Sequence, residues 1–122
     1  MRNRKNKFNA VGCRRGGIWY GSRTEAEYAD LLELEKRAGL IKDFVAHPPG
    51  VALVGNTRWN IDFMVIDNDG AERYVEVKGM KTEGYRIKLQ LYKDRKKMLK
   101  LPPLMVVARY GCMKFRAIEQ VA

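Results

Sequence analysis

Two strand-like segments joined by a short turn place the tightest constraint on how this chain can fold. Residues 59–66 (WNIDFMVI) and 74–78 (YVEVK) are rich in β-branched and aromatic side chains, which favour strands. The linking residues 67–70 (DNDG) are typical of tight turns. The sequence therefore predicts a β-hairpin whose two strands run antiparallel.

The turn also predicts the register of this hairpin. Three-residue hairpin loops commonly carry glycine in a left-handed third position, so residues 68–70 form the expected loop and Asp67 pairs with Ala71. Counting five residues away from that pair along each strand brings Asp62 opposite Glu76, with their Cβ atoms about 5 Å apart. A two-residue turn would shift the register by one residue and separate the two acids.

Two facing carboxylates repel each other unless a positive charge lies between them. Lys78 shares the face of Glu76, because side chains two residues apart in a strand point the same way. The cation is then Lys78 itself or a divalent ion, and Mg²⁺ (or Mn²⁺) suits Asp62, Glu76 and the backbone carbonyl of Val77 as ligands. A metal at this point would activate water for attack on a phosphodiester, with Lys78 steadying the developing charge. In the alternative interpretation, Asp62 pairs with Lys78 across the strands and Glu76 is a solvated surface residue.

The rest of the chain alternates helical and strand-like patterns. Ser22 and Glu25 form a capping box that begins a helix, and Gly39 ends it. A second helix is predicted over residues 86–100, before Pro102 and Pro103. Further strands are predicted over residues 41–45, 51–54, 104–108 and 114–118. This order predicts an α/β fold with a central mixed sheet flanked by helices.

The charge balance favours a polyanionic partner. Lys and Arg number 24 against 14 Asp and Glu among 122 residues, a net charge of +10, and nucleic acid is the expected partner. A membrane surface and charge for solubility alone are the alternatives. No strongly amphipathic basic helix with a large apolar face stands out, and no apolar run approaches the roughly 20 residues that span a bilayer, so no membrane association is expected. The candidate DNA-binding residues are basic residues near the N-terminus and on the second helix: Arg14, Arg15, Arg86, Lys88, Lys93, Lys96 and Lys97.

The N-terminal residues 1–16 are predicted to form a flexible basic arm that ends at a pair of glycines, followed by one domain over residues 17–122. The two cysteines, Cys13 and Cys112, form no CxxC pair and have no standard zinc spacing with His47. A reduced, cytoplasmic protein is therefore expected.

The pattern of Asp62 followed by Glu76-Val77-Lys78 resembles the core of the PD-(D/E)XK nuclease superfamily, and Ser22–Glu25 resembles the start of its first helix. The resemblance covers roughly residues 18–118 and is closest to small phage-encoded Holliday-junction-resolvase-like endonucleases, with Ile61 where the name-giving proline would be. It implies an αβββαβ restriction-endonuclease-like core and action in the host-cell cytoplasm. It also implies the following catalytic residues: Glu25, Asp62, Glu76 and Lys78.

Within this resemblance, Asp62 and Glu76 match the metal-binding acids, Lys78 the catalytic lysine, and Glu25 a further candidate ligand. A capping box explains Glu25 equally well, because a side chain that reaches back to its own N-cap does not reach a metal. Glu27 is the substitute in that case.

The resemblance leads us to expect an Mg²⁺-dependent endodeoxyribonuclease that acts on branched DNA, such as a four-way junction. Paired cuts at a junction need two active sites, so a homodimer is expected. The alternatives are a nicking or exonucleolytic enzyme with the same site, and a basic DNA-binding protein without catalysis.

Overall fold

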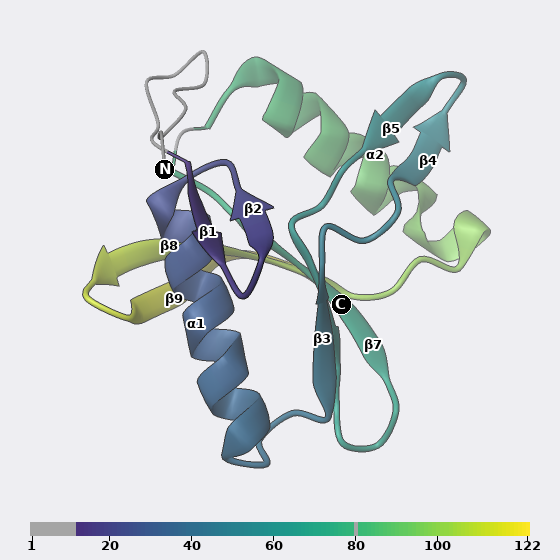
Figure 1. Cartoon of the computed structure of the whole chain (residues 1–122). Coiled ribbons are helices and arrows are strands. Elements are labelled where there is room, and N and C mark those ends of the chain that lie inside the picture. The colour runs from purple at the N-terminus through teal and green to yellow at the C-terminus, as the bar shows by residue number, and fades with distance from the viewer. Residues whose placement is uncertain (1–11, 80) are drawn as a thin grey trace.

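The structure, a computed structural model, describes residues 12–79 and 81–122. A central five-stranded mixed sheet is flanked by helices α1 (Arg23–Arg37) and α2 (Glu83–Leu99) (Figure 1). In spatial order the sheet contains β3 (Asp43–Ala46), β6 (Phe63–Ile66), β7 (Glu72–Val77), β8 (Leu104–Gly111) and β9 (Lys114–Val121). The core order α1, β3, β6, β7, α2, β8 is αβββαβ, so the predicted α/β fold class is confirmed.

The hairpin β6–β7 has the predicted register. Phe63 pairs with Val75 in the antiparallel ladder, and the Asp67 backbone N–H donates to the Ala71 carbonyl at 2.8 Å. Gly70 has φ = 88°, the left-handed conformation that the third loop position requires. Strands β7 and β8 run parallel, and α2 supplies the crossover between them.

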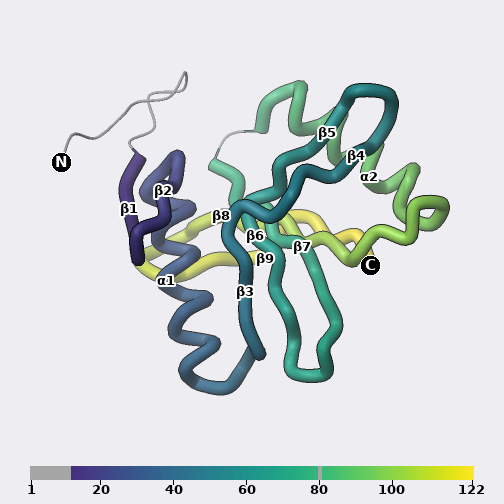
Figure 2. The backbone as a smooth tube through the Cα atoms, turned by 45° about the vertical axis from the view of Figure 1, so that its right-hand side comes forward, coloured from purple at the N-terminus to yellow at the C-terminus, as the bar shows by residue number. Residues whose placement is uncertain are grey.

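The predicted strand over residues 59–66 is wrong at its start. Trp59 ends a separate strand, β5 (Thr57–Trp59), which pairs with β4 (Val51–Val54) beside α2 (Figure 2). The chain then leaves strand geometry at residues 60–62 before β6 begins. Trp59 packs edge-on against Tyr92 of α2, with ring centroids 6.0 Å apart, and this tertiary contact overrides the local strand pattern.

The prediction of a flexible arm over residues 1–16 is also wrong where the structure can test it. Residues 13–15 form β1 (Cys13–Arg15), which pairs with β2 (Ile18–Tyr20) in a tight hairpin. Gly16 and Gly17 have φ of 56° and 82°, so they form the turn of this hairpin rather than a flexible junction. The remainder of the predicted arm, residues 1–11, lies outside the described residues.

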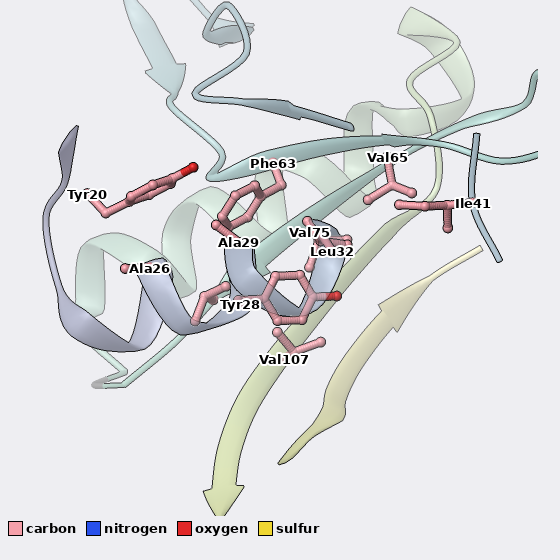
Figure 3. Close-up of a cluster of buried hydrophobic side chains, with 11 residues drawn as sticks. Tyr20, Ala26, Tyr28, Ala29, Leu32, Ile41, Phe63, Val65, Val75 and Val107 are labelled. Carbon is pink, nitrogen blue, oxygen red and sulfur yellow. The ribbon is translucent and has the colours of Figure 1, made fainter. Parts of the chain in front are cut away.

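Each helix covers one face of the sheet with its own apolar core. Phe63, fully buried, meets the Tyr28 ring of α1 with centroids 5.5 Å apart in the first core (Figure 3). In the second core, α2 packs Leu89 and Tyr92 against Leu104 and Val106 of β8. The first core is formed by Tyr20, Ala26, Tyr28, Ala29, Leu32, Ile41, Phe63, Val65, Val75, Val77 and Val107.

Strand β7 contributes to both cores by alternation. Val75 and Val77 belong to the α1 core, whereas Tyr74 packs against the α2 core. Because successive side chains of a strand point to opposite faces, Glu76 and Lys78 lie on the α2 face of the sheet.

Both helices begin at side-chain caps. The Ser22 hydroxyl accepts a hydrogen bond from the Glu25 backbone N–H, and the Thr82 hydroxyl accepts one from the Tyr85 backbone N–H, each at 3.1 Å. Gly39, with φ = 76°, follows the C-terminus of α1, so the predicted helix end is confirmed.

In the part of the chain that the structure describes, neither helix has the length and apolar character that a membrane crossing would require.

Candidate active site

Two hydrogen bonds hold Asp62 at the open end of the β6–β7 hairpin, one to Glu76 and one to Val77. The Asp62 backbone N–H donates to Glu76 Oε1 at 3.1 Å, and the Val77 backbone N–H donates to Asp62 Oδ2 at 2.8 Å. The Asp62 carbonyl accepts from the His47 backbone N–H at 2.9 Å, so the end of β3 also holds this residue. The predicted juxtaposition of the two acids is therefore present.

Lys78 contacts Glu76 from the same face of β7. Its Nζ lies 2.8 Å from Glu76 Oε2, and its side chain is 19 % exposed, against 5 % for Glu76. The alternative interpretation, with Glu76 in solvent and Lys78 paired to Asp62, does not hold, because Glu76 is buried and is itself the partner of Lys78.

Glu25 lies close enough to the site to interact with its charges. Burial raises the pKa of Glu25, the Glu76 carboxylate raises it further, and a backbone hydrogen bond at Gly21 together with Lys78 lowers it. The hydroxyl of Ser22 is used by the backbone N–H of Glu25, not by its side chain. The Glu25 carboxyl group thus interacts with the backbone at Gly21, next to the N-cap, and also lies near enough to Glu76 and Lys78 to feel their charges.

Glu27, the substitute for Glu25, lies elsewhere. Its Oε2 is 2.6 Å from Arg109 Nε and accepts a hydrogen bond from the Met113 backbone N–H. Glu27 therefore links α1 to β8 and to the β8–β9 turn, and its carboxylate is occupied by these contacts.

The electrostatics of Asp62 show a surplus of negative charge at this point. Burial raises the pKa of Asp62 well above its ordinary value, and the Glu76 and Glu25 carboxylates raise it further, while the Val77 N–H lowers it. Three carboxyl groups thus influence one another at this point, and the Lys78 ammonium pairs with Glu76 among them.

The donor set of the site fits a hard divalent cation. In the described part of the chain, no three His, Cys, Asp or Glu side chains are grouped closely enough to hold a metal ion by themselves. Mg²⁺, however, is commonly held by one or two carboxylates, with waters and substrate phosphates completing its shell. The N–H and C=O of one strand residue point toward the same neighbouring strand, so the Val77 carbonyl faces the side of Asp62, as its N–H does.

The predicted DNA-binding residues lie on two separate elements. Arg14 and Arg15 are exposed on β1, where Arg15 pairs with Asp30 of α1 at 3.1 Å. On α2, Lys93 Nζ lies 3.7 Å from Glu119 of β9. The other predicted residues, on the exposed or half-exposed surface of α2, are Arg86, Lys88, Lys96 and Lys97.

The sequence did not decide the role of one residue that lies beside Lys78. Tyr85, in the first turn of α2, lies under the Lys78 ammonium, with Nζ 4.7 Å from the ring centroid. The only sequence signal for this position is Thr82, whose capping role places residue 85 at the start of the helix.

The fold and the site define an α/β protein in which two acids and a lysine converge at the end of a hairpin in a central mixed sheet. The chain belongs to the family described as "Protein of unknown function (DUF1064)", whose model matches residues 5–112. The matched range includes Glu25, Asp62, Glu76 and Lys78. No curated protein matches the chain.

Proposed function

We propose that the protein is a metal-dependent endonuclease that hydrolyses phosphodiester bonds in branched DNA. The observation that carries this proposal is the grouping of Asp62, Glu76 and Lys78: Glu76 accepts a hydrogen bond from the Asp62 backbone N–H through one oxygen and pairs with the Lys78 ammonium through the other. An acid pair beside an ammonium group is what hydrolysis of a phosphodiester needs, because the reaction requires a place for a cation and a stabiliser of developing negative charge.

Asp62, Glu76 and the Val77 carbonyl would hold Mg²⁺ (or Mn²⁺), with Glu25 near enough to bias the charge of the site. When bound, the ion would polarise a phosphoryl oxygen and lower the pKa of a water. Lys78 would donate hydrogen bonds to the attacking water and to the oxygens on which negative charge builds. Glu76 holds Lys78 in place for this task through the 2.8 Å ion pair.

The charge of the protein supports a nucleic-acid substrate. A net charge of +10 on 122 residues attracts a polyanion, and several lysines and arginines of α2 lie on its exposed surface. Binding through phosphates alone reads shape rather than base sequence, which suits a branched substrate.

The choice of a four-way junction follows from the resemblance of Asp62 and Glu76-Val77-Lys78 to the PD-(D/E)XK core of small junction-resolving enzymes. Two matched cuts across a junction require two active sites, so the acting species would be a homodimer.

The test is cleavage of an end-labelled four-way junction and a linear duplex of matched sequence, each in Mg²⁺ and in EDTA. The variant Glu76→Gln removes a charge from the site, and Glu72→Gln, an exposed residue at the start of the same strand, is the matched control. Paired cuts at the junction that require Mg²⁺ and Glu76, but not Glu72, support the proposal.

Other outcomes separate the alternatives. Equal cutting of the linear duplex would retain the nuclease and reject the preference for branched DNA. Tight binding without cuts in Mg²⁺ or Mn²⁺ would reject catalysis in favour of a DNA-binding protein.

A further inference from the structure

The aromatic face of Tyr85 lies against the Lys78 ammonium. Lys78 Nζ lies 4.7 Å from the centroid of the ring, within the range of a cation–π contact. Tyr85 is 5 % exposed, so the contact is shielded from water on the side of the ring. Shielding strengthens an interaction of this kind.

The surroundings of Tyr85 hold its ring in one orientation. Its backbone N–H donates to the Thr82 hydroxyl at 3.1 Å, which fixes the residue in the first turn of α2. Trp59 of β5 packs edge-on against it, with centroids 6.2 Å apart and planes at 68°. The ring thus offers Lys78 a fixed aromatic face.

The hydroxyl of Tyr85 does not contribute to the contact with Lys78. Among the residues that the structure describes, it is a buried polar atom without a hydrogen-bond partner. Burial, Glu119 and Glu76 raise the pKa of Tyr85, so the phenol stays neutral near pH 7 and no phenolate competes with Glu76 for the ammonium. The attraction between Tyr85 and Lys78 therefore comes from the ring.

We propose that Tyr85 is a positioning residue, whose aromatic face holds the Lys78 ammonium at the site while the Glu76 carboxylate is engaged elsewhere. This inference rests on the proposed function in one respect, namely that Lys78 acts on the scissile phosphate. A carboxylate that ligates a cation attracts a neighbouring ammonium less strongly, whereas the ring contact does not depend on the charge of Glu76. The ring thus preserves the position of Lys78 when its ion pair weakens.

The contact itself can be measured without any enzyme activity. In protein labelled with ¹³C at the lysine ε carbons, the ring current of Tyr85 should move the Lys78 ε-proton resonance upfield of the other lysines. The resonance is identified by its absence from the spectrum of Lys78→Arg. It should keep its upfield position in Tyr85→Phe and lose it in Tyr85→Leu. A Lys78 resonance that lies among the other lysines in the wild type and in Tyr85→Phe would overturn the proposal.

The functional consequence is tested by single-turnover cleavage of the four-way junction. Tyr85→Leu should slow cleavage about tenfold with unchanged junction affinity, and Tyr85→Phe should cut at the wild-type rate. Tyr85→Phe should also melt no lower than the wild type, since it removes only the unpartnered hydroxyl. Equal losses in both variants would assign the role to the hydroxyl and overturn the proposal.

The two proposals fail separately. A wild-type protein that cuts no DNA rejects the proposed function, whereas the NMR comparison still decides whether the ring positions Lys78. Cleavage that is normal in a folded Tyr85→Leu variant rejects the positioning role and leaves the proposed function standing.

Discussion

Replacing Asp62 with asparagine should make the metal-free protein more stable. The carboxyl group of Asp62 is partly buried near those of Glu76 and Glu25, whose charges raise its pKa, and the Lys78 ammonium pairs with Glu76. Asparagine retains an oxygen that can accept the hydrogen bond from the Val77 N–H, now 2.8 Å from Asp62 Oδ2. The substitution therefore removes a repelling charge and keeps the packing.

The expected gain follows from the spacing of the facing side chains. Asp62 lies just before the first ladder pair and is held next to Glu76 by the bonds of the Asp62 and Val77 backbone N–H groups. Two like charges about 5 Å apart repel by about 3 kcal/mol at an effective dielectric constant of about 20. The Lys78 ammonium offsets part of this repulsion. We expect Asp62→Asn to raise the free energy of unfolding by about 1–2 kcal/mol, or roughly 4–8 °C in melting temperature.

The gain should depend on pH with a defined sign. The pKa of Asp62 is raised in the folded state, so between about pH 4 and that folded-state pKa the folded protein holds a proton that the unfolded chain releases. The stability of the wild type therefore declines as pH rises through this window, and the asparagine variant lacks this decline. The difference between them should be small near pH 4 and grow toward pH 7.

Urea unfolding at a series of pH values in EDTA measures this difference. Asp67→Asn is the matched control, because Asp67 lies on the same hairpin but gains from the positive charge of Arg73, 3.1 Å away. That control should be unchanged or less stable by up to about 1 kcal/mol. A destabilised Asp62→Asn, or a difference that does not grow with pH, would refute the electrostatic argument.

Three further predictions test the fold and the proposed interface. Gly39→Ala should lower the free energy of unfolding by about 1 kcal/mol, because φ is 76° at this position although a Cβ would meet no atom. Gly79→Ala is the control, since that position is equally open but has no positive φ, and its stability should not change. Equal melting temperatures for the two variants would contradict this reasoning. Phe63→Ala should cost about 3–5 kcal/mol in urea unfolding, because the side chain is fully buried in the α1 core, and a cost below about 1 kcal/mol would contradict its place there. Replacing Arg86 and Lys97 together with alanine should lower the slope of log affinity for DNA against log salt by about 2, and an unchanged slope would remove α2 from the interface.

The pairing of Asp62 with Glu76 could be predicted because the hairpin turn determines the register. Glycine in the third loop position selects a three-residue loop, which determines the pairing of residues 63–66 with residues 72–75 and brings Asp62, just before that ladder, next to Glu76. The two ends of α1 were predictable for a similar reason, since Ser22 and Gly39 act through local backbone geometry, whereas α2 begins at Glu83, three residues before the predicted start.

Tertiary contacts determined what the sequence could not predict. A continuous apolar run does not reveal that Trp59 leaves the central sheet to pack against Tyr92 of α2. The basic residues of β1 led to the prediction of a flexible arm. Charge composition carries no information about strand pairing, so it could not reveal that β1 pairs with β2. The Ser-x-x-Glu pattern fits both a cap and a site residue, and the sequence does not reveal that Glu25 feels the charges of Glu76 and Lys78.

The central claim, that Lys78 acts in a hydrolytic site with Asp62 and Glu76, is tested most directly by single-turnover cleavage of a four-way junction in Mg²⁺ by Lys78→Ala. Lys42→Ala, an exposed lysine before β3, is the control for the loss of one positive charge. We predict that Lys78→Ala cuts at least about 100-fold more slowly than the wild type with similar junction affinity, while Lys42→Ala cuts normally. Cleavage by Lys78→Ala at the wild-type rate, or equal losses in both variants, would contradict the account.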